Sequence, residues 1–234
     1  MWNRKELKAR GKAAFRANYW RSVLSAFLLI GLTAAGGGSA WKGTRESVQE
    51  TGLNFSSMTK EQITALVTVA LVIVGAVATV SLIATLVKIF VWNPLDVGCH
   101  RFFFTNAEAP ATLGELGYGF KNCYWDCVKT IFLRDLFLFL WALLFIVPAI
   151  VKSYSYRMVP YILADEPALS GTAAITRSRE MMRGHKWSVF VLDLSFIGWY
   201  FLDALTLGIL GVFYVHPYLA ATDAELYRAL KEEA

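Results

Sequence analysis

The sequence predicts an all-α fold: a polytopic membrane helix bundle of about six spans, in three helix–span–span units with interfacial amphipathic helices. The 234 residues are 56% hydrophobic and only 18% charged, which is too apolar for an ordinary soluble domain. The apolar residues are also gathered in blocks. Several blocks approach the ~20 residues that a helix needs to cross a ~30 Å hydrocarbon layer. Composition and its distribution therefore both indicate an integral membrane protein.

A short motif that occurs three times predicts the three units. FRANYW at 15–20 returns as FKNCYW at 120–125 and, more loosely, as MRGHKW at 182–187. Each copy precedes apolar runs that end at a proline: Pro94, Pro160 and Pro217. A recurring order of this kind predicts one membrane domain, 1–234, with repeat units at 1–98, 108–166 and 169–228. The alternative is a recurrent membrane-entry motif without common ancestry.

The elements follow from the charges and the apolar blocks in chain order. Segment 3–21 holds seven basic residues and one acid, Glu6, which predicts an amphipathic helix on an anionic membrane surface; a solvated tail is the alternative. Pro148 suits the first turn of a new helix after a hairpin, although the two middle spans could also form one kinked helix. The expected spans are 20–40, 63–91, 131–147, 148–165, 187–206 and 208–226.

The loop charges predict the orientation. The segments on the side of the N-terminus carry most of the basic residues, whereas the opposite side carries only Lys42, Arg45 and Lys60. This asymmetry predicts a multi-pass plasma-membrane protein with both termini in the cytoplasm. The net charge of +5 then belongs to the topology and to contact with anionic headgroups, so we expect the bilayer, and no nucleic acid, as a partner.

Several stretches resemble one known family. They are ELKARGKAAFRANYW (6–20), NPLDVGCHRFF (93–103), LWALLFIVPAIVKSYSYRMVPYILADEP (140–167), SREMMRGHKWSVFVLDLSFIGW (178–199) and LTLGILGVFYVHPYLAATDAELY (205–227). Together they are similar to domain of unknown function 975, an uncharacterised bacterial membrane family. The resemblance implies a bacterial polytopic membrane protein and supplies no activity.

Two acids are out of place in the fifth expected span. Asp193 and Asp203 lie in or near apolar sequence, where a carboxylate at mid-bilayer costs about 2.5–3.5 kcal/mol on insertion scales. They should therefore face protein, water or a cation. An ion pair with Arg157 is the structural interpretation for Asp193. A substrate or proton pathway is the functional alternative for both acids.

Two further sets of residues recur between the units. Each unit has an acid after its proline: Asp96, Asp165 and Asp223. These acids are either helix caps or a ring of carboxylates at the cytoplasmic mouth of the bundle. The other set stands at the start of the apolar runs, where amphipathic indoles anchor a helix at the headgroup level: Trp20, Trp125 and Trp187.

The sequence leaves two classes of function open. One is a non-enzymatic, transport-type bundle for a small solute, peptide or lipid; the other is a membrane scaffold or accessory subunit that binds lipid or a partner protein. No convergent nucleophile, base and oxyanion donors are recognisable, so we expect no enzyme and no cofactor. Cys99, Cys123 and Cys127 are odd in number and all lie on the predicted cytoplasmic side, so we expect no structural disulfides. They also lack metal-ligand spacing, so we expect no metal site. A homo-oligomer or a membrane partner remains possible on this basis.

Overall fold

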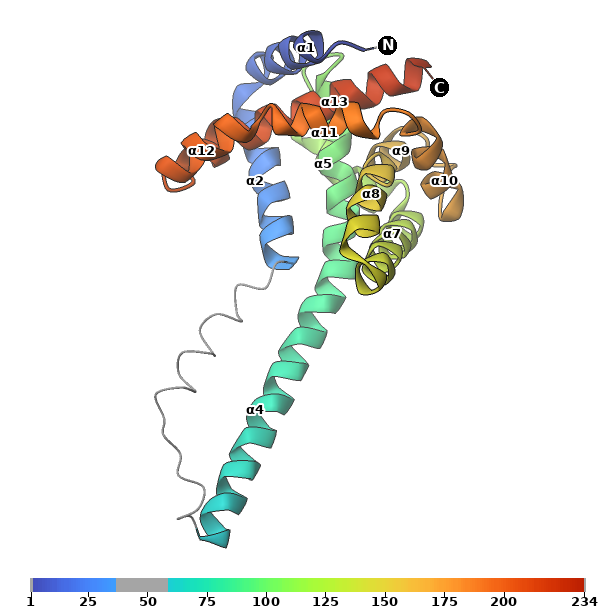
Figure 1. The fold of residues 1–234 in the computed structure, drawn as a ribbon. Helices are drawn as coiled ribbons and strands as arrows, with labels where there is room; N and C mark the ends of the chain where they lie inside the picture. The colour runs from blue at the N-terminus through green and yellow to red at the C-terminus, as the bar shows by residue number, and fades with distance from the viewer. Residues whose placement is uncertain (1, 37–58, 234) are drawn as a thin grey trace.

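The computed structural model describes residues 2–36 and 59–233, and in these residues it is helical throughout, with no strand. The predicted all-α class is confirmed. Most helices gather at one end of the molecule, where both termini also lie, and α4 extends far from this end (Figure 1). The predicted outer loop, with Lys42 and Arg45, lies outside the described residues.

The first two helices are α1 (Arg4–Ala17) and α2 (Tyr19–Gly36). The side chain of Asn3 caps α1 by accepting a hydrogen bond from the Lys5 amide at 3.0 Å. Leu7, Gly11 and Phe15 recur every four residues and form the buried face. This face packs on α13 (His216–Glu233), where a Cβ at Gly11 would lie only 2.8 Å from the Thr222 hydroxyl. The predicted amphipathic helix therefore covers protein on its apolar side.

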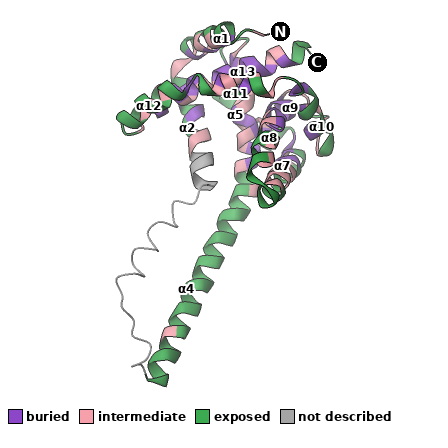
Figure 2. Ribbon diagram, viewed as in Figure 1, coloured by how far each residue is buried: buried purple, intermediate pink, exposed green. Residues whose placement is uncertain are grey.

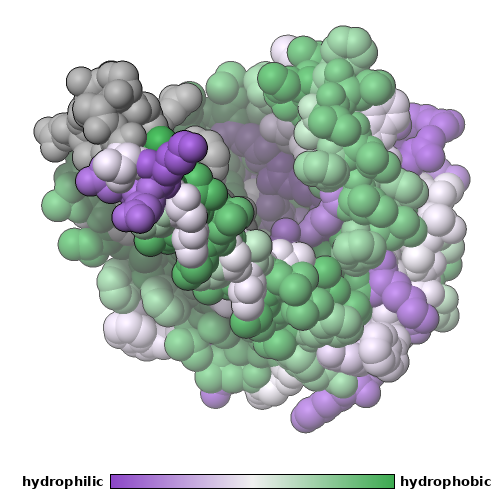
Figure 3. All heavy atoms as spheres, turned by 90° about the horizontal axis from the view of Figure 1, so that it is seen from below, coloured by the Kyte–Doolittle hydropathy of each residue, from purple (hydrophilic) through white to green (hydrophobic). Residues whose placement is uncertain are grey.

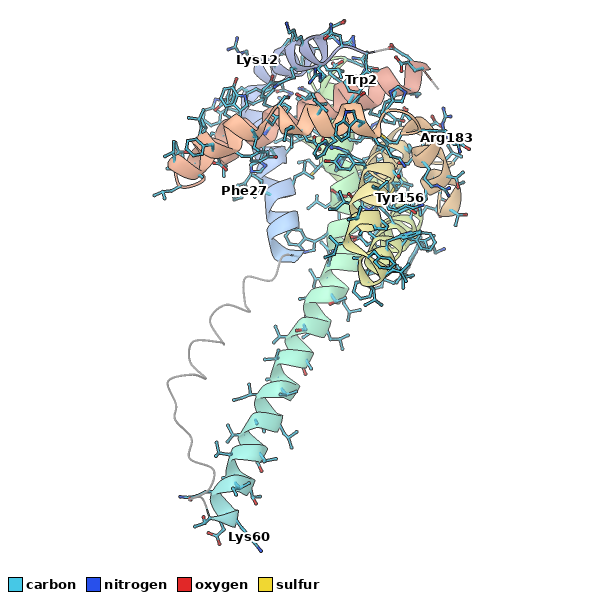
Figure 4. The ribbon with its side chains drawn as sticks, viewed as in Figure 1. Trp2, Lys12, Phe27, Lys60, Tyr156 and Arg183 are labelled. Carbon is cyan, nitrogen blue, oxygen red and sulfur yellow. A yellow bond between two sulfur atoms is a disulfide. The ribbon has the colours of Figure 1, made fainter. Side chains whose placement is uncertain are left out.

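The longest helical segment runs through α4 (Lys60–Val87), the π-helical turn η3 (Lys88–Trp92) and α5 (Asn93–Asn106). Thr59 and Gln62 form a reciprocal capping box at its start. None of the residues of α4 is buried, whereas most of α5 is. Figure 2 shows this contrast along the ribbon, and Figure 4 shows the side chains of α4 projecting from an isolated rod.

The middle of the chain forms a hairpin. It comprises η4 (Leu113–Gly117), α6 (Tyr118–Lys121), α7 (Tyr124–Leu144), α8 (Ile146–Ser155) and α9 (Val159–Asp165). The extended backbone of Phe145 separates α7 from α8, and the two helices pack together, so this region is a hairpin rather than one kinked helix. The predicted span 148–165 is interrupted by a turn at 156–158, and α9 beyond it belongs to the protein core.

The last part comprises α10 (Thr172–Met181), α11 (Lys186–Leu194), α12 (Ile197–Leu205), η5 (Gly211–Val215) and α13. Leu207 and Gly208 have positive φ and make the turn at the boundary between the expected spans 187–206 and 208–226. The direction of this hairpin differs from the predicted bundle, because α11, α12 and α13 run across the direction of α4 (Figure 1). The predicted span 208–226 mostly falls in α13, whose buried residues include Glu225.

Only part of the predicted membrane topology is present in the described residues. Two helical segments there are long and apolar enough to cross a membrane, Lys60–Asn106 and Lys186–Leu205, and Tyr19–Ile30 is a shorter apolar helix. Six spans are not confirmed. Hydropathy alone does not separate apolar residues that face lipid from those buried in protein, and α9 and α13 belong to the second kind.

The recurring motifs occupy equivalent positions in the helices. Trp20, Trp125 and Trp187 are each the second residue of a helix, in α2, α7 and α11. The three unit-ending prolines are likewise each second in a helix, in α5, α9 and α13. Pro160 suits this position because the first amides of a helix have no partner within it, whereas Pro94 and Pro217 follow the π-helical turns η3 and η5 inside continuous helical segments.

Two backbone carbonyls that lack a hydrogen bond because of Pro94 and Pro217 each accept one from a tyrosine hydroxyl of another repeated motif. Pro94 and Pro217 have no N–H to donate to the residues four positions earlier, Phe90 and Phe213. Tyr124 OH donates to Phe90 O at 3.1 Å, and Tyr19 OH donates to Phe213 O at 3.2 Å. The tyrosine of one repeated segment thus bonds the carbonyl that the proline of another segment leaves without a donor.

The cysteines differ from expectation at one place. Cys123 and Cys127 form a disulfide, so the expectation of no structural disulfide is wrong for this pair. Cys123 is the N-cap of α7 and lies outside helical geometry, which brings it within reach of Cys127 one turn later, with 5.6 Å between the Cα atoms. Cys99 is free and buried.

Candidate charged cavity

Arg157 stands at the centre of one group of largely buried charges. It follows α8 in the turn before α9, and its guanidinium lies between α11 and α13. Nη1 donates to Asp193 Oδ2 at 2.6 Å, and Nη2 donates to Asp223 Oδ1 at 2.8 Å. Tyr154 OH donates to the same Asp193 oxygen at 3.0 Å. The side chains of Arg157 and Asp223 are 21% and 18% exposed, so these are largely desolvated, charge-assisted hydrogen bonds.

A second group of charges joins α5 to α7. Asp96 contacts His100 one helical turn later, with 3.3 Å between Oδ1 and Nδ1. Arg134 lies 3.9 Å from the other Asp96 oxygen and 2.8 Å from Asp135 Oδ1. Lys88 Nζ completes the chain at 3.4 Å from Asp135 Oδ2. Four charged residues and a histidine thus join η3 and α5 to α7.

Aromatic rings lie beside the charged groups. His100 and Tyr161 make an edge-to-face contact, with 4.6 Å between their ring centroids. Tyr161 is fully buried and stacks on Tyr227 at 5.4 Å. These contacts hold α5, α9 and α13 together behind the charges, which gives the ion pairs a rigid support.

A cavity of about 410 Å³ opens onto these charges. Its walls come from α7, α8, α11 and the turn after α8, and its polar groups include both guanidiniums and a carboxylate. Seen from below, hydrophilic side chains lie deep in a hollow between hydrophobic walls (Figure 3). The residues that line the cavity are Arg134, Leu138, Ile150, Ser153, Tyr154, Tyr156, Arg157 and Asp193.

Asp203 is not brought into this group. Its Oδ1 accepts a hydrogen bond from the Gly211 amide at 2.6 Å, which ties α12 to η5 across the hairpin. Gly211 has no room for a side chain there, because a Cβ would meet this carboxylate. In the structure Asp203 therefore serves the hairpin, whereas Asp193 faces the cavity.

The acids that follow the prolines each have a different cationic partner. Asp96 contacts His100, and Asp223 contacts Arg157. Asp165 contacts Lys231 and accepts a hydrogen bond from Tyr227 OH at 2.8 Å. Burial, with this hydrogen bond, raises the pKa of Tyr227 well above its ordinary value. None of the three is an N-cap residue: Asp96 lies in the first turn of α5, Asp165 ends α9, and Asp223 is inside α13.

The three tryptophans remain on the surface. Trp20, Trp125 and Trp187 are 73%, 59% and 72% exposed, which is unusual for so large an apolar side chain in a protein with a packed core. Each follows directly on the short connection between two helices. Their side chains are thus free to contact an interface between an apolar phase and water.

Sequence reasoning missed two partners in the charged groups. Asp96 and His100 are four residues apart, a spacing that places them on one helix face and that could have been recognised. The contact of Asp223 with Arg157 carries no local signal, because 66 residues separate the two. The ion pair of Arg157 with Asp193 joins residues 36 positions apart. It was one of the alternatives from the sequence, and that prediction rested only on the cost of burying a charge.

In the described residues the protein is all-helical, and its cavity opens onto charged residues between helices with long apolar stretches. Residues 129–234 match the model of the family described as Protein of unknown function (DUF975). The resemblance noted from the sequence motifs is thereby confirmed over this range, which contains Arg134, Arg157, Asp193 and Asp223. No curated protein and no solved structure matches the chain.

Proposed function

We propose that this chain is an integral protein of a bacterial plasma membrane, with both termini in the cytoplasm. Support comes first from α4 (Lys60–Val87), in which no residue after Glu61 is charged and none is buried. Such a surface is unfavourable in water and favourable in a hydrocarbon layer. Both termini and the basic α1 lie at the end opposite Lys60, as the loop charges predict (Figures 1 and 4).

The bilayer is proposed to surround α2, α4 and the tips of the two hairpins. The tip of the α7–α8 hairpin exposes five consecutive large apolar residues, 143–147. The α12–η5 turn exposes Leu205, Leu207 and Ile209, with Leu207 93% exposed. Exposed apolar surface of this extent marks a membrane or a partner surface. We propose lipid, because residues 136–151 around the α7–α8 tip carry no charge, whereas the start of α7 and the end of α8 do.

We further propose that the protein is a transport-type bundle whose charged cavity accepts the polar part of a small solute, peptide or lipid. The observation that carries this proposal is the cavity of about 410 Å³ that reaches Arg134, Arg157 and Asp193 between apolar helices. Charged groups inside a membrane are costly, and they commonly line substrate or ion pathways. A scaffold would have no need of an open space beside its ion pairs.

The test fills the cavity without touching the ion pairs. Ser153 lines the cavity and is exposed, and its hydroxyl donates only to the nearby Ile150 carbonyl, at 2.7 Å. Ser153→Trp should therefore leave the melting temperature unchanged and abolish flux. Proton flux is measured in proteoliposomes loaded with a pH-sensitive dye, with a mixture of amino acids and dipeptides outside. Asp193→Asn, which removes a cavity acid, should also abolish it.

The matched control is Thr68→Trp, which places the same side chain on the exposed surface of α4 and should keep wild-type flux. Wild-type protein that gives no more flux than protein-free liposomes argues against transport and favours the scaffold function. Equal flux in Ser153→Trp and the wild type places the pathway outside this cavity and contradicts the proposal.

A further inference from the structure

A second cavity, of about 440 Å³, lies between the end of α8 and the turn that joins α10 to α11. Its lining is strongly basic, with four cationic side chains and one acid, Glu180. The tryptophan that begins α11 forms one edge. The residues that matter are Lys152, Arg179, Glu180, Arg183, Lys186 and Trp187.

The four cations of this basic pocket have no carboxylate partner. Among the described residues, none of them takes part in an ion pair, whereas Arg10, Arg157, Arg228 and Lys231 all do. Lys152 instead places its Nζ 4.8 Å from the centre of the Trp141 ring. Like charges held close together without a counterion repel one another, so the pocket is arranged for an anion from outside the chain.

The backbone around the pocket is fixed. Ser178 Oγ donates to Ser155 O at 2.8 Å and ties α10 to the end of α8. Gly184 has φ +85°, a conformation that glycine adopts without strain, and it turns the chain from Arg183 toward Lys186. Met182 is fully buried beneath this turn. Arg183 therefore stands on a supported turn, with Arg179 and Lys186 on the helices on either side of it.

The surroundings of the pocket indicate which anion it takes. Trp187 is 72% exposed at the start of α11, where an indole sits at the headgroup level of a bilayer. Apolar residues of the adjoining helices are also exposed: Ile150 and Val151 on α8, and Phe190 and Leu194 on α11. Arg183 lies near the end of the molecule that carries the termini, far from Lys60 (Figure 4). A basic pocket beside an apolar flank suits a phosphate with an acyl chain attached.

We infer that this pocket binds the phosphate group of an anionic membrane lipid, with the acyl chains along the exposed flank of α8 and α11. Arginine and lysine are the side chains that bind phosphate through charge-assisted hydrogen bonds. The inference rests on the proposed membrane location, and it is independent of flux through the charged cavity. Free phosphate shares the chemistry, so the experiment separates the two sources.

The experiment uses the full chain in a neutral detergent. Dissociation constants are measured for short-chain phosphatidylglycerol, short-chain phosphatidylcholine and inorganic phosphate by thermal shift, and bound lipid is counted by native mass spectrometry. We expect phosphatidylglycerol to bind at least tenfold more tightly than either other probe. A triple variant should bind phosphatidylglycerol about tenfold more weakly or worse, a loss of about 1.4 kcal/mol or more. It carries Arg179→Gln, Arg183→Gln and Lys186→Gln.

The matched control removes three cations of α1 that have no ion-pair partner among the described residues: Arg4→Gln, Lys5→Gln and Arg16→Gln. This control loses the same charge and should keep its affinity within about twofold, because the electrostatic steering of a dispersed surface is weak at physiological salt. Both triple variants should melt as the wild type does without lipid, since the substituted side chains are largely exposed.

Three results would overturn the inference. Equal binding of phosphatidylcholine would show that charge is not recognised. An equal loss of phosphatidylglycerol affinity in the α1 control would show that the lipid is attracted by dispersed surface charge rather than by a pocket. Tighter binding of inorganic phosphate than of phosphatidylglycerol would assign the pocket to a soluble anion. Flux that fails while lipid affinity persists would contradict the proposed function alone, so the two failures are distinguishable.

Discussion

Replacement of Arg157 by glutamine is expected to lower the free energy of unfolding by about 3–5 kcal/mol, the range for breaking a buried ion pair in soluble proteins. Arg157 is the one described cation within ion-pairing distance of Asp193 and Asp223, so its loss leaves two largely buried carboxylates uncompensated. Asp193→Asn should cost less, because Asp223 still neutralises the guanidinium. Unfolding in detergent, followed by intrinsic fluorescence, measures both.

The control for this prediction is Lys129→Gln, an exposed cation of α7, which should melt as the wild type does. Adding Asp193→Asn and Asp223→Asn to Arg157→Gln should recover much of the stability, because the triple variant leaves no charge unpaired. A single Arg157→Gln variant as stable as the wild type would show that water compensates both acids. The charged group would then not be a buried one.

Gly98→Ala is expected to destabilise the protein by about 3 kcal/mol, at the upper end of the cost of overpacking. A Cβ on Gly98 would overlap the backbone carbonyl of Leu116, and a Cβ on Gly119 would overlap that of Pro94. Both obstacles are backbone atoms, which cannot turn aside as a side chain can. The change should therefore push α5 away from η4 and lower the melting temperature.

Gly75→Ala is the matched control. Gly75 lies inside α4, and a Cβ there would meet nothing within 4 Å. Alanine favours a helix over glycine by about 0.5–1 kcal/mol, so this variant should melt at or slightly above the wild-type temperature. Equal melting of Gly98→Ala and Gly75→Ala would contradict the close packing of α5 on η4.

The sequence identified what depends on local pattern. The turn at Leu207 and Gly208 and the break before Pro148 were recognisable from residue types that favour them. The equivalence of the three motifs was also readable, and the structure places each tryptophan second in its helix. The ion pair of Arg157 with Asp193, one of two alternatives from the sequence, followed from the cost of a charge in apolar sequence.

What the sequence did not identify depends on contacts between distant segments. Hydropathy predicted spans where α9 and α13 are instead covered by the protein's own residues. The partner of Asp223, Arg157, was missed because the position of Asp223 after Pro217 suggested only a helix cap or a ring of carboxylates. The Cys123–Cys127 disulfide was missed because all three cysteines were assigned to the reducing cytoplasmic side, whereas the bond forms through the cap geometry of α7.

The measurement that tests the central claim most directly is the water accessibility of the charged cavity within a bilayer. Cysteines are placed one at a time in a cysteine-free background in liposomes and treated with a membrane-impermeant maleimide. Ser153→Cys, in the cavity, should react, and Lys60→Cys, at the far end of α4, should react faster. Leu82→Cys, on the 60% exposed but apolar surface of α4, should not react. Labelling of Leu82→Cys at the rate of Lys60→Cys would place α4 in water, and an inert Ser153→Cys would close the cavity; either result contradicts a membrane protein with a water-filled, charged cavity.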